Sequence, residues 1–378
     1  MNIVVNTRLL LKGRLEGIGW FAFETLKRIT QKHPEHTFYF IFDRPFDPVF
    51  IFSENVIPIV IGPQARHPFL FYLWFEYSVP KILKRVKADI FVSPDGYLSL
   101  SSKTRQLAVI HDLNFEHYPH DLPRIIVWYY KYFFPRFAVK ASRIATVSEY
   151  SKKDIQDKYK IAADKIDVVY NGVNEMFHPV SSLEKEAVKE KYAGGCDYFI
   201  FIGALLPRKN LKNLFLAFDL FRKQTGFQHK LLIVGARKWW TDELESIFCR
   251  MEYKKDVVFT GRLGEEEINT ILAGATALTY VSYFEGFGIP ILEAFRCRIP
   301  VITSNVTSMP EVAGNAALLT DPFDPASIAE AMNKIATDPQ LCETLLQNAQ
   351  TISGSFSWDR SAELLWNCIE KTMNESFL

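Results

Sequence analysis

The sequence predicts an α/β protein built from two doubly wound, Rossmann-like domains. Short runs rich in valine, isoleucine, leucine and phenylalanine alternate with helix-length segments over most of its 378 residues. These runs are apolar at nearly every position, which is typical of strands buried on both faces of a parallel sheet. A chain of this length is also too long for one ordinary hydrophobic core and suits two domains.

The first half contains a series of predicted strands with helices between several of them. The predicted strands cover residues 3–11, 38–42, 57–61, 89–93, 106–111, 143–147 and 166–170. The predicted helices cover residues 20–31, 70–85 and 123–140. Alternation of this kind indicates right-handed β-α-β units in a parallel sheet.

The second half repeats the pattern after a break near residues 174–195. Strands are predicted at residues 198–203, 230–235, 257–260, 277–281, 301–303 and 317–319. The prediction is therefore a first domain at residues 1–178 and a second at 179–357. Residues 358–378 form a separate terminal segment, in which Trp358, Leu365 and Ile369 belong to an apolar stripe with helical spacing. In folds of this type ligands bind beyond the carboxyl ends of the strands, so a site in a cleft between two facing domains is expected.

Composition excludes several classes of function. The formal net charge of +1 gives no global electrostatic basis for binding nucleic acid. The cysteines lie singly at Cys196, Cys249, Cys297, Cys342 and Cys368, without the paired spacing of a zinc site or a disulfide framework. The first residues lack a signal-peptide pattern, and no apolar run reaches the length of about 18 residues needed for a membrane span. We therefore expect a cytoplasmic protein that meets a membrane, if at all, only at its surface.

The most informative segment is EGFGIPILEA, residues 285–294, between a predicted strand and a predicted helix. Gly286 and Gly288 allow a close backbone approach to a ligand, and the helix behind them favours an anion at its N-terminus. Glu285 falls in the loop and Glu293 in the first helical turns, where carboxylates suit the paired hydroxyls of sugars. On spacing alone, a loop with two solvated glutamates explains this pattern equally well.

Two other strand ends carry polar residues. The segment GALLPRKN, residues 203–210, presents Arg208 and Lys209 before a predicted helix, which suits a pyrophosphate. His111 follows the apolar run 106–110, where a side chain at the carboxyl end of a strand points towards a ligand. Solvated basic residues and a histidine bonded to loop backbone remain the alternatives.

Taken together, these motifs resemble the retaining glycosyltransferases of family 4, which have the two-Rossmann-domain fold called GT-B. EGFGIPILE looks like the E-x7-E signature of that group. The agreement covers nearly the whole chain, in order: GIG at 17–19, HDL at 111–113, VSEYSK at 147–152, NGV at 171–173, GALLPRKN, IVGA at 233–236, FTGRL at 259–263, PVITSN and SMPEVAG. Each motif alone is weak, and their common order is specific.

The resemblance implies roles for the residues of EGFGIPILE. Glu293 would bind the ribose hydroxyls of a nucleotide diphosphate-sugar, and Glu285 would contact hydroxyls of the transferred sugar as a catalytic residue. The backbone of Gly286, Phe287 and Gly288 would line the sugar and the phosphates. Gly17, Gly19, Gly203 and Gly235 would complete the donor-binding set, the first two from the other domain.

Arg208 and Lys209 would bind the diphosphate, and His111 would contact the donor sugar near the reacting centre. Many members have arginine directly after the strand-end glycine, where this chain has Ala204. Arg208 then replaces that charge from a shifted position. No cofactor and no metal is expected, because the sequence has no D-x-D pair and the leaving diphosphate would be stabilised by Arg208, Lys209 and helix dipoles. The family's last helix crosses back, so residues 358–378 are expected to pack on the first domain.

The expected reaction is transfer of a hexose to a saccharide or lipid-linked acceptor in surface polysaccharide or glycolipid synthesis. GDP-mannose is the first expectation for the donor and a UDP-sugar the second, because HDL and PRKN resemble mannosyltransferase-like members. Two aromatic and basic stretches, residues 67–77 and 123–137, are either core-packing helices or a surface for an acceptor or a membrane. An epimerase on the same fold is the alternative function. A phosphorylase is not favoured, because this sequence has no segment that resembles a pyridoxal phosphate site. The presence of His111, Lys209, Glu285 and Glu293 together argues against a non-catalytic binding protein.

Overall fold

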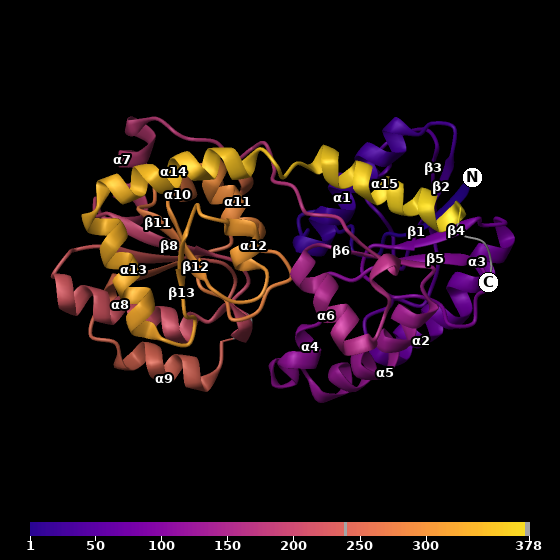
Figure 1. The fold of residues 1–378 in the computed structure, drawn as a ribbon, viewed down its shortest axis with the longest axis horizontal. Helices are drawn as coiled ribbons and strands as arrows, with labels where there is room; N and C mark the ends of the chain where they lie inside the picture. Colours follow the sequence, from indigo (N-terminus) through magenta and orange to yellow (C-terminus); the bar gives the residue numbers. More distant parts are fainter. Residues whose placement is uncertain (238–239, 375–378) are drawn as a thin grey trace. The chain divides into compact units, whose positions relative to one another are not determined.

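The computed structural model describes residues 1–237 and 240–374 and divides the chain into two compact domains (Figure 1). The first comprises residues 1–172 and 357–374, and the second comprises Val173–Phe356; residues 375–378 of the predicted terminal segment lie outside the described residues. Each has one parallel β-sheet with helices around it, which confirms the predicted α/β class. None of the helices described is long and apolar enough to cross a bilayer.

The first domain is built on a seven-stranded sheet with the order β3-β2-β1-β4-β5-β6-β7. The strands are β1 Asn2–Asn6, β2 Thr37–Phe42, β3 Val56–Val60, β4 Ile90–Ser93, β5 Arg105–Val109, β6 Arg143–Thr146 and β7 Ile166–Val168. All neighbouring pairs are parallel. The chain moves outward from β1 to β3 and then returns to β4 beside β1. The carboxyl ends of β1 and β4 are therefore the topological switch point, where such sheets bind ligands.

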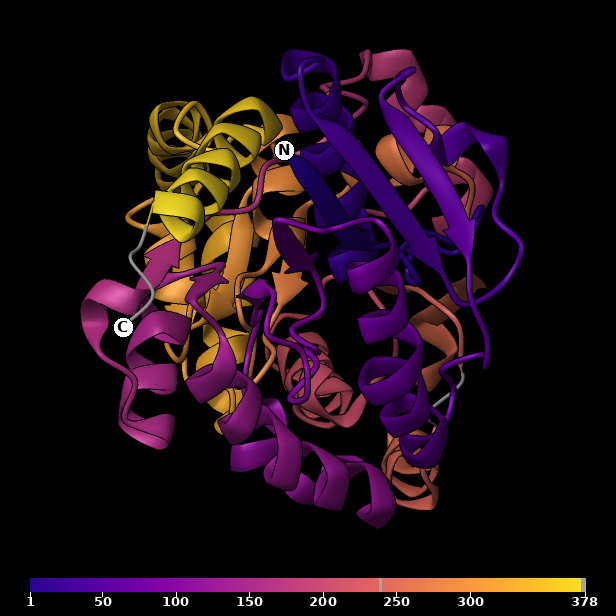
Figure 2. The ribbon, with the colours of Figure 1, turned by 90° about the vertical axis from the view of Figure 1, so that its right-hand side faces the viewer.

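The helices of the first domain cover both faces of this sheet. They are α1 Gly17–Lys32, α2 Pro68–Leu73, α3 Val79–Arg85, α4 Asn114–His117, α5 Arg124–Lys140 and α6 Glu149–Tyr159. Figures 1 and 2 show α1 over one face of the sheet and α5 over the other. The central strands β1, β4, β5 and β6 are almost completely buried, as their apolar composition predicts, whereas the edge strand β3 has Ile57 and Val60 exposed.

Two elements of this domain differ in the structure from the bounds predicted from the sequence. The strand predicted at residues 3–11 ends at Asn6, because the chain turns there and the Leu10 amide donates to the Thr7 carbonyl (3.0 Å). The helix predicted at residues 70–85 is interrupted by a π-helical turn, Trp74–Ser78, between α2 and α3. Pro80 has no N–H to donate to the carbonyl four residues before it, so the α-helical pattern does not run through this position.

The second domain has a six-stranded parallel sheet with the order β10-β9-β8-β11-β12-β13. Its strands are β8 Tyr198–Ile202, β9 Lys230–Val234, β10 Val257–Gly261, β11 Ala277–Tyr280, β12 Val301–Ser304 and β13 Leu318–Thr320. Its helices are α7 Ser182–Ala193, α8 Leu211–Thr225, α9 Asp242–Arg250, α10 Glu265–Ala273, α11 Ile289–Arg296, α12 Met309–Ala313, α13 Pro325–Thr337 and α14 Pro339–Ser353. Here β8 and β11 flank the switch point.

The last helix, α15 Trp358–Asn374, belongs to the first domain, as expected. It packs against α1, β4, β5 and β6. Ser361 Oγ donates to the Tyr170 carbonyl (2.5 Å), and Lys371 pairs with Asp167 of β7 (2.7 Å). At Gly172 a Cβ atom would lie 2.3 Å from the Trp358 backbone nitrogen, so only glycine allows the helix to start there.

The domain boundary lies six residues before the predicted position at 178/179. Residues 173–178 are held by the second domain: the His178 amide donates to Asn269 Oδ1 (3.0 Å), and Arg296 Nε donates to the Phe177 carbonyl (3.2 Å). The second boundary, predicted after residue 357, lies after Phe356.

Candidate active site

In the second domain the charged side chains of two distant segments meet in one cluster around the buried Glu285. Glu285 lies in the loop between β11 and α11, while Arg208 and Lys209 lie in the 3-10 turn after β8. Arg208 Nη1 is 2.5 Å from Glu285 Oε2, and Lys209 Nζ is 2.5 Å from Glu285 Oε1. Because β8 and β11 are neighbours in the sheet, their carboxyl ends bring these segments together.

Tyr280, the last residue of β11, completes this cluster. Its hydroxyl donates to Glu285 Oε1 (2.9 Å) and accepts from Lys209 Nζ (2.5 Å). Burial, and then the nearby charge of Glu285, raises the pKa of Tyr280 well above 10, so the hydroxyl stays protonated. Tyr280 was not selected from the sequence, where its only distinguishing feature is its place near the end of a predicted strand.

The charges of the cluster sum to a net positive value. Burial acts to raise the pKa of Glu285, which is 5% exposed, but the charges of Arg208 and Lys209 and their hydrogen bonds lower it to about 2. The carboxylate is therefore ionised at neutral pH and offsets one of the two cations. Arg208, Lys209 and Glu285 together carry a formal charge of +1, which suits a negatively charged ligand.

The loop after Glu285 is fixed through its carbonyl groups. Ser308 Oγ lies 2.9 Å from the Glu285 carbonyl and 3.0 Å from the Phe287 carbonyl, and the Glu285 amide is 3.4 Å from Thr307 Oγ1. Gly288 has a φ of 106°, a left-handed conformation that favours glycine, and it precedes the first turn of α11. Gly286 and Phe287 are buried in the same loop. Ser308 is the first residue of the SMPEVAG motif and Thr307 precedes it; the sequence suggested no individual role for either.

Glu293 is in a different electrostatic environment from Glu285. It lies on α11, and burial alone raises the pKa of its carboxyl group to about 7. Within residues 1–237 and 240–374 its carboxylate makes no ion pair, which explains why nothing counteracts the desolvation. A half-buried carboxyl group that lacks a protein counter-charge is well suited to share hydrogen bonds with ligand hydroxyls.

Gly203 and Gly235 lie directly after the neighbouring strands β8 and β9. A Cβ atom on Gly235 would lie 2.0 Å from the Gly203 carbonyl oxygen, and both residues have a φ of 154°. The two glycines therefore let the strand ends approach closely beside the Arg208–Lys209 turn. Asn210, which has a φ of 61°, fixes the other end of that turn by donating to the Val281 carbonyl (2.9 Å).

In the first domain, His111 lies after β5. Its Nε2 is 2.8 Å from the Pro94 carbonyl, and its ring meets the Phe21 ring edge-on at 5.1 Å. A carbonyl oxygen only accepts hydrogen bonds, so Nε2 carries the proton and Nδ1 is the acceptor when the ring is neutral. Burial lowers the pKa of His111, which favours the neutral ring at pH 7.

Gly17 and Gly19 are at the N-terminus of α1, beyond β1. A Cβ atom on Gly17 would meet no described atom within 4 Å, whereas one on Gly19 would lie 3.1 Å from the Leu15 side chain. Gly17 thus leaves space at the helix N-terminus, and Gly19 serves local packing.

A buried polar network at the same switch point was not predicted. Arg8 Nε donates to Asp95 Oδ2 (2.7 Å), and Asn6 Nδ2 donates to Asp95 Oδ1 (2.8 Å). The guanidinium also lies 4.5 Å from the centre of the Tyr97 ring. Asp95 follows Pro94, the partner of His111, so the network fixes the loop that orients the histidine. Its only sign in the sequence was the polar Asn6 and Arg8 within an apolar run.

Comparison with known proteins gives one matching family model in each of the two domains. Residues 16–176 match the family described as Glycosyltransferase Family 4, and residues 184–352 match Glycosyl transferases group 1. The O-antigen chain mannosyltransferase B of Escherichia coli is 30% identical over 293 residues, which cover 77% of this chain and 75% of that protein. The O-antigen chain mannosyltransferase RfbU of Salmonella typhimurium is 30% identical over 285 residues, covering 75% and 76% of the two chains.

Solved structures support the same fold at lower identity. The sucrose-phosphate synthase of Thermosynechococcus elongatus matches with a TM-score of 0.79 at 16% identity, over 100% of both chains. This likeness shows the GT-B architecture, and the relatives provide the family. None of these proteins supports the epimerase alternative. With its two matched halves and its relatives of similar length, the chain belongs to the glycosyltransferases of family 4.

Proposed function

We propose that this glycosyltransferase moves a hexose, with mannose as the first candidate, from a nucleotide diphosphate-sugar to a saccharide or lipid-linked saccharide. The observation that carries the proposal is the buried Arg208–Glu285–Lys209 cluster beside the N-terminus of α11. It offers a net positive charge and ordered donors to a diphosphate. The relatives named above are O-antigen chain mannosyltransferases, which supports mannose as the sugar and surface polysaccharide synthesis as the process.

The donor is proposed to bind along the carboxyl edge of the second sheet. Arg208 and Lys209 are proposed to contact phosphate oxygens as well as Glu285, because a guanidinium group has five N–H donors and an ammonium group has three. Glu293 accepts hydrogen bonds from ribose hydroxyls, and Glu285 from the sugar. GDP-mannose is the favoured donor and a UDP-sugar the next.

In the proposed reaction the bond between the anomeric carbon and the diphosphate oxygen breaks. The acceptor oxygen bonds to the same face of that carbon, which retains the configuration. The acceptor proton goes to an oxygen of the leaving diphosphate, whose charge Arg208 and Lys209 stabilise. His111 accepts a hydrogen bond from a sugar hydroxyl at its Nδ1 and is not required as a base, and no metal ion takes part.

A panel of nucleotide sugars, incubated with cell-derived acceptors and without them, tests this proposal. We expect transfer from GDP-mannose, an anomeric configuration in the product that equals the donor's, and full activity in the presence of EDTA. In thermal shift, a nucleotide at 100 times its Kd stabilises the protein by about 2.7 kcal/mol. Free epimerised sugar formed without an acceptor would contradict transfer, and an inverted product would contradict retention.

The roles of the two glutamates are tested with matched variants. Glu285→Gln increases the net positive charge of the cluster, so we expect nucleoside diphosphate affinity to be kept or increased while turnover falls. Glu293→Ala removes an acceptor for ribose hydroxyls, so we expect weaker nucleotide binding. Calorimetry with the bare nucleotide beside steady-state kinetics measures both. Equal loss of nucleotide affinity in the two variants would defeat this division of roles.

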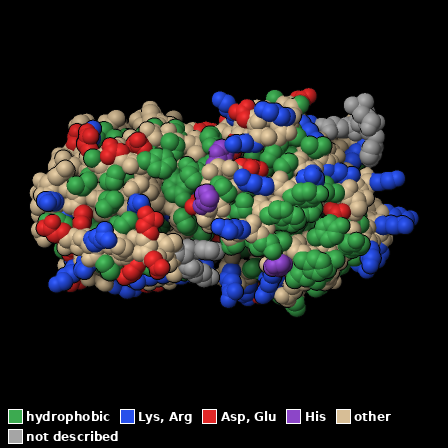
Figure 3. Space-filling view, turned by 90° about the horizontal axis from the view of Figure 1, so that it is seen from below, with side chains coloured by type: hydrophobic (Ala, Val, Ile, Leu, Met, Phe, Trp, Pro, Cys, Tyr) green, Lys and Arg blue, Asp and Glu red, His purple; other side chains and the backbone are tan. Residues whose placement is uncertain are grey.

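We further propose that the first domain contacts the cytoplasmic face of a membrane through α2 and α5. The two aromatic stretches, residues 67–77 and 123–137, contain both core residues and exposed residues. Phe71, Trp74, Tyr129 and Phe137 are core residues, whereas exposed aromatic side chains lie on the outer faces: Phe69, Tyr72, Tyr77, Trp128 and Tyr132. Figure 3 shows hydrophobic side chains gathered on the face of this domain, with lysines and arginines around them.

This surface combines contacts that suit a lipid headgroup region. The rings of Trp128 and Tyr132 stack with their centres 5.8 Å apart, and Arg136 lies 3.7 Å from the centre of the Tyr132 ring. Arg124 and Lys131 are exposed on the same helix. Exposed aromatic rings with basic residues match the interface of an anionic bilayer. Flotation with vesicles of anionic lipid, compared with neutral vesicles, should show binding that Trp128→Ser weakens; equal recovery of both proteins with both vesicles would contradict the proposal.

A further inference from the structure

A group of potential metal ligands lies in the loop between α1 and β2, away from the candidate active site. The loop has the sequence His33-Pro34-Glu35-His36, directly before β2. It is therefore at the amino end of the parallel sheet, whereas His111 follows the carboxyl end of β5. Any role of this loop is separate from the binding site at the other edge of the sheet.

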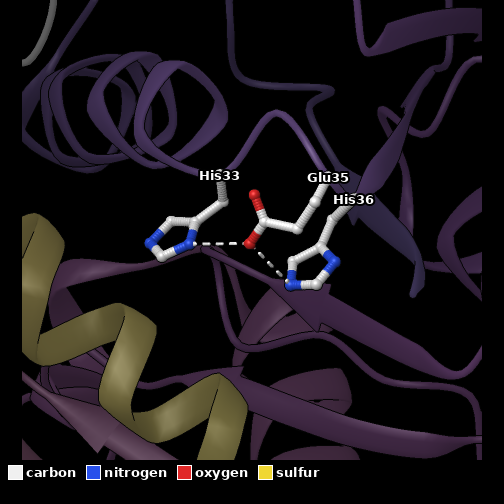
Figure 4. A group of neighbouring side chains, drawn as sticks. All are labelled: His33, Glu35 and His36. Atoms are coloured by element: carbon white, nitrogen blue, oxygen red, sulfur yellow. Dashed lines mark hydrogen bonds and ion pairs between the residues drawn. The ribbon is translucent and has the colours of Figure 1, made fainter.

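Three side chains of the loop converge on one point (Figure 4). Glu35 Oε1 lies 3.4 Å from His33 Nδ1 and 3.3 Å from His36 Nε2. All the ligand atoms of the group lie within 4.8 Å of one another. The imidazole rings are nearly parallel, with an angle of 5° between their planes. Two ring nitrogens and one carboxylate oxygen thus face a common position.

These separations fit a tetrahedral metal centre. With bonds of about 2.0–2.1 Å, ligand atoms on a tetrahedral zinc ion lie about 3.3–3.4 Å apart. The two distances to Glu35 already have this value, so only the two nitrogens need to approach each other, by rotation of the rings. Two histidines and one carboxylate that leave a fourth position for water are a known ligand set for zinc.

The loop backbone is already held in this conformation. Asn55 Nδ2 donates to the carbonyls of Thr30 (3.1 Å), His33 (3.0 Å) and His36 (3.0 Å). The His36 amide also donates to the His33 carbonyl (3.2 Å). A metal ion would therefore meet a formed loop and would not need to order one, which lowers the cost of binding.

The same histidines contact the last helix. The Trp366 ring of α15 stacks on His33 with ring centres 3.6 Å apart and on His36 at 5.2 Å. Trp366 is buried, so this contact is part of the packing of α15 on the first domain. Fixing the two imidazole rings would also fix the surface on which the tryptophan packs.

We propose that His33, Glu35 and His36 bind a divalent transition metal ion of the zinc class, and that the bound ion stabilises the packing of α15 on the first domain. The site acts on stability and takes no part in transfer. A ligand that binds only the folded state raises its stability by mass action.

The test is calorimetric titration of the full, tag-free chain with zinc chloride in a buffer that does not chelate. We expect one ion bound at this site, and affinity at least tenfold lower in His33→Ala and in His36→Ala. His120→Ala removes an exposed histidine elsewhere in the first domain and should leave the affinity unchanged. Glu35→Gln keeps the size of the side chain and serves as the third variant if a histidine variant fails to fold.

Tryptophan fluorescence gives a second readout that reports on α15. Cu²⁺ quenches nearby indole rings, so it should quench wild type more than Trp366→Phe, although six other tryptophans remain. Zinc should also raise the Tm of wild type and not that of His36→Ala. Absence of zinc binding, equal affinity in wild type and the His33→Ala/His36→Ala double variant, or equal quenching with and without Trp366 would overturn the proposal. None of these results depends on donor binding, so they leave the proposed transfer reaction untouched.

Discussion

The two glutamates of EGFGIPILE should affect stability in opposite directions as pH changes. The matched substitutions Glu293→Gln and Glu285→Gln test this, because each replaces a carboxyl group by a neutral amide of almost the same size. The two residues share one loop and helix, and no ligand is needed for the measurement. What differs is the environment: burial without a counter-charge for Glu293, and two cations for Glu285.

For Glu293 the folded protein holds its proton more tightly than the unfolded chain does. Its pKa is about 7 when folded, against 4.5 for an exposed glutamate. The contribution of the protonated Glu293 carboxyl group to the free energy of unfolding is therefore complete below pH 4.5 and is lost as the pH rises through 7. The difference corresponds to about 3 kcal/mol. At pH 8 Glu293→Gln should be more stable than wild type by up to this amount, and near pH 4.5 the two should be almost equal.

For Glu285 the sign is reversed. A folded pKa of about 2, below the 4.5 of an exposed group, stabilises the protein above pH 4.5, and this stabilisation is lost as the pH falls towards 2. Glu285→Gln leaves Arg208 and Lys209 without their counter-charge. Breaking a buried ion pair in this way costs about 3–5 kcal/mol, so this variant should be less stable than wild type at pH 8.

Denaturant unfolding and thermal melting at pH 4.5 and pH 8 measure both effects. In a domain of this size, 1 kcal/mol shifts Tm by about 2–4 °C, so Glu293→Gln should raise the Tm of the second domain by up to about 6–12 °C at pH 8. The domains can unfold separately, so a probe in the second domain is needed. If Glu293→Gln shifts Tm equally at both pH values, or lowers it at pH 8, the assigned pKa and the reasoning from burial are wrong.

Three further predictions concern the diphosphate, the metal dependence and the last helix. Lys209→Ala should weaken nucleoside diphosphate binding by about 1.5–3 kcal/mol in calorimetry, which is the range for a charge-assisted hydrogen bond. If Arg208→Ala binds the nucleotide normally, Arg208 does not replace the arginine that is absent at Ala204. EDTA should leave the transfer rate of wild type intact even if it lowers Tm by removing an ion from the His33 site; an absolute requirement for a divalent cation in the transfer assay would contradict the metal-free reaction. Gly172→Ala places a Cβ atom 2.3 Å from the Trp358 backbone, so it should melt at clearly lower temperature than wild type and expose the last helix to proteolysis, whereas an unchanged Tm would mean that the backbone shifts freely there.

The sequence was sufficient for the elements whose pattern is local. The buried parallel strands were recognisable because they are apolar throughout, and the last helix because Trp358, Leu365 and Ile369 recur with helical spacing. The interruption at Trp74–Ser78 was missed because Pro80 within an apolar run only weakly indicates how the turn before it is wound.

Interactions between distant segments were not predictable in the same way. Arg208 and Glu285 are 77 positions apart, so the sequence assigned one to phosphate and the other to sugar and gave no sign that they pair. Only the adjacency of β8 and β11 brings them together. The raised pKa of Glu293 likewise depends on what surrounds α11 in three dimensions, and the Arg8–Asp95 pair joins residues 87 positions apart.

The return of α15 to the first domain also determines the order in which the chain can finish folding. The second domain is one continuous segment, Val173–Phe356, and it interrupts the first. On the ribosome, the 184 residues of that segment must be synthesised before α15 appears, which takes roughly 10–40 s at about 5–20 residues per second. During this interval α1, β4, β5 and β6 lack the helix that covers them. The domain that is translated first is thus completed last, and its uncovered apolar surface is the part of the nascent chain most in need of protection from aggregation.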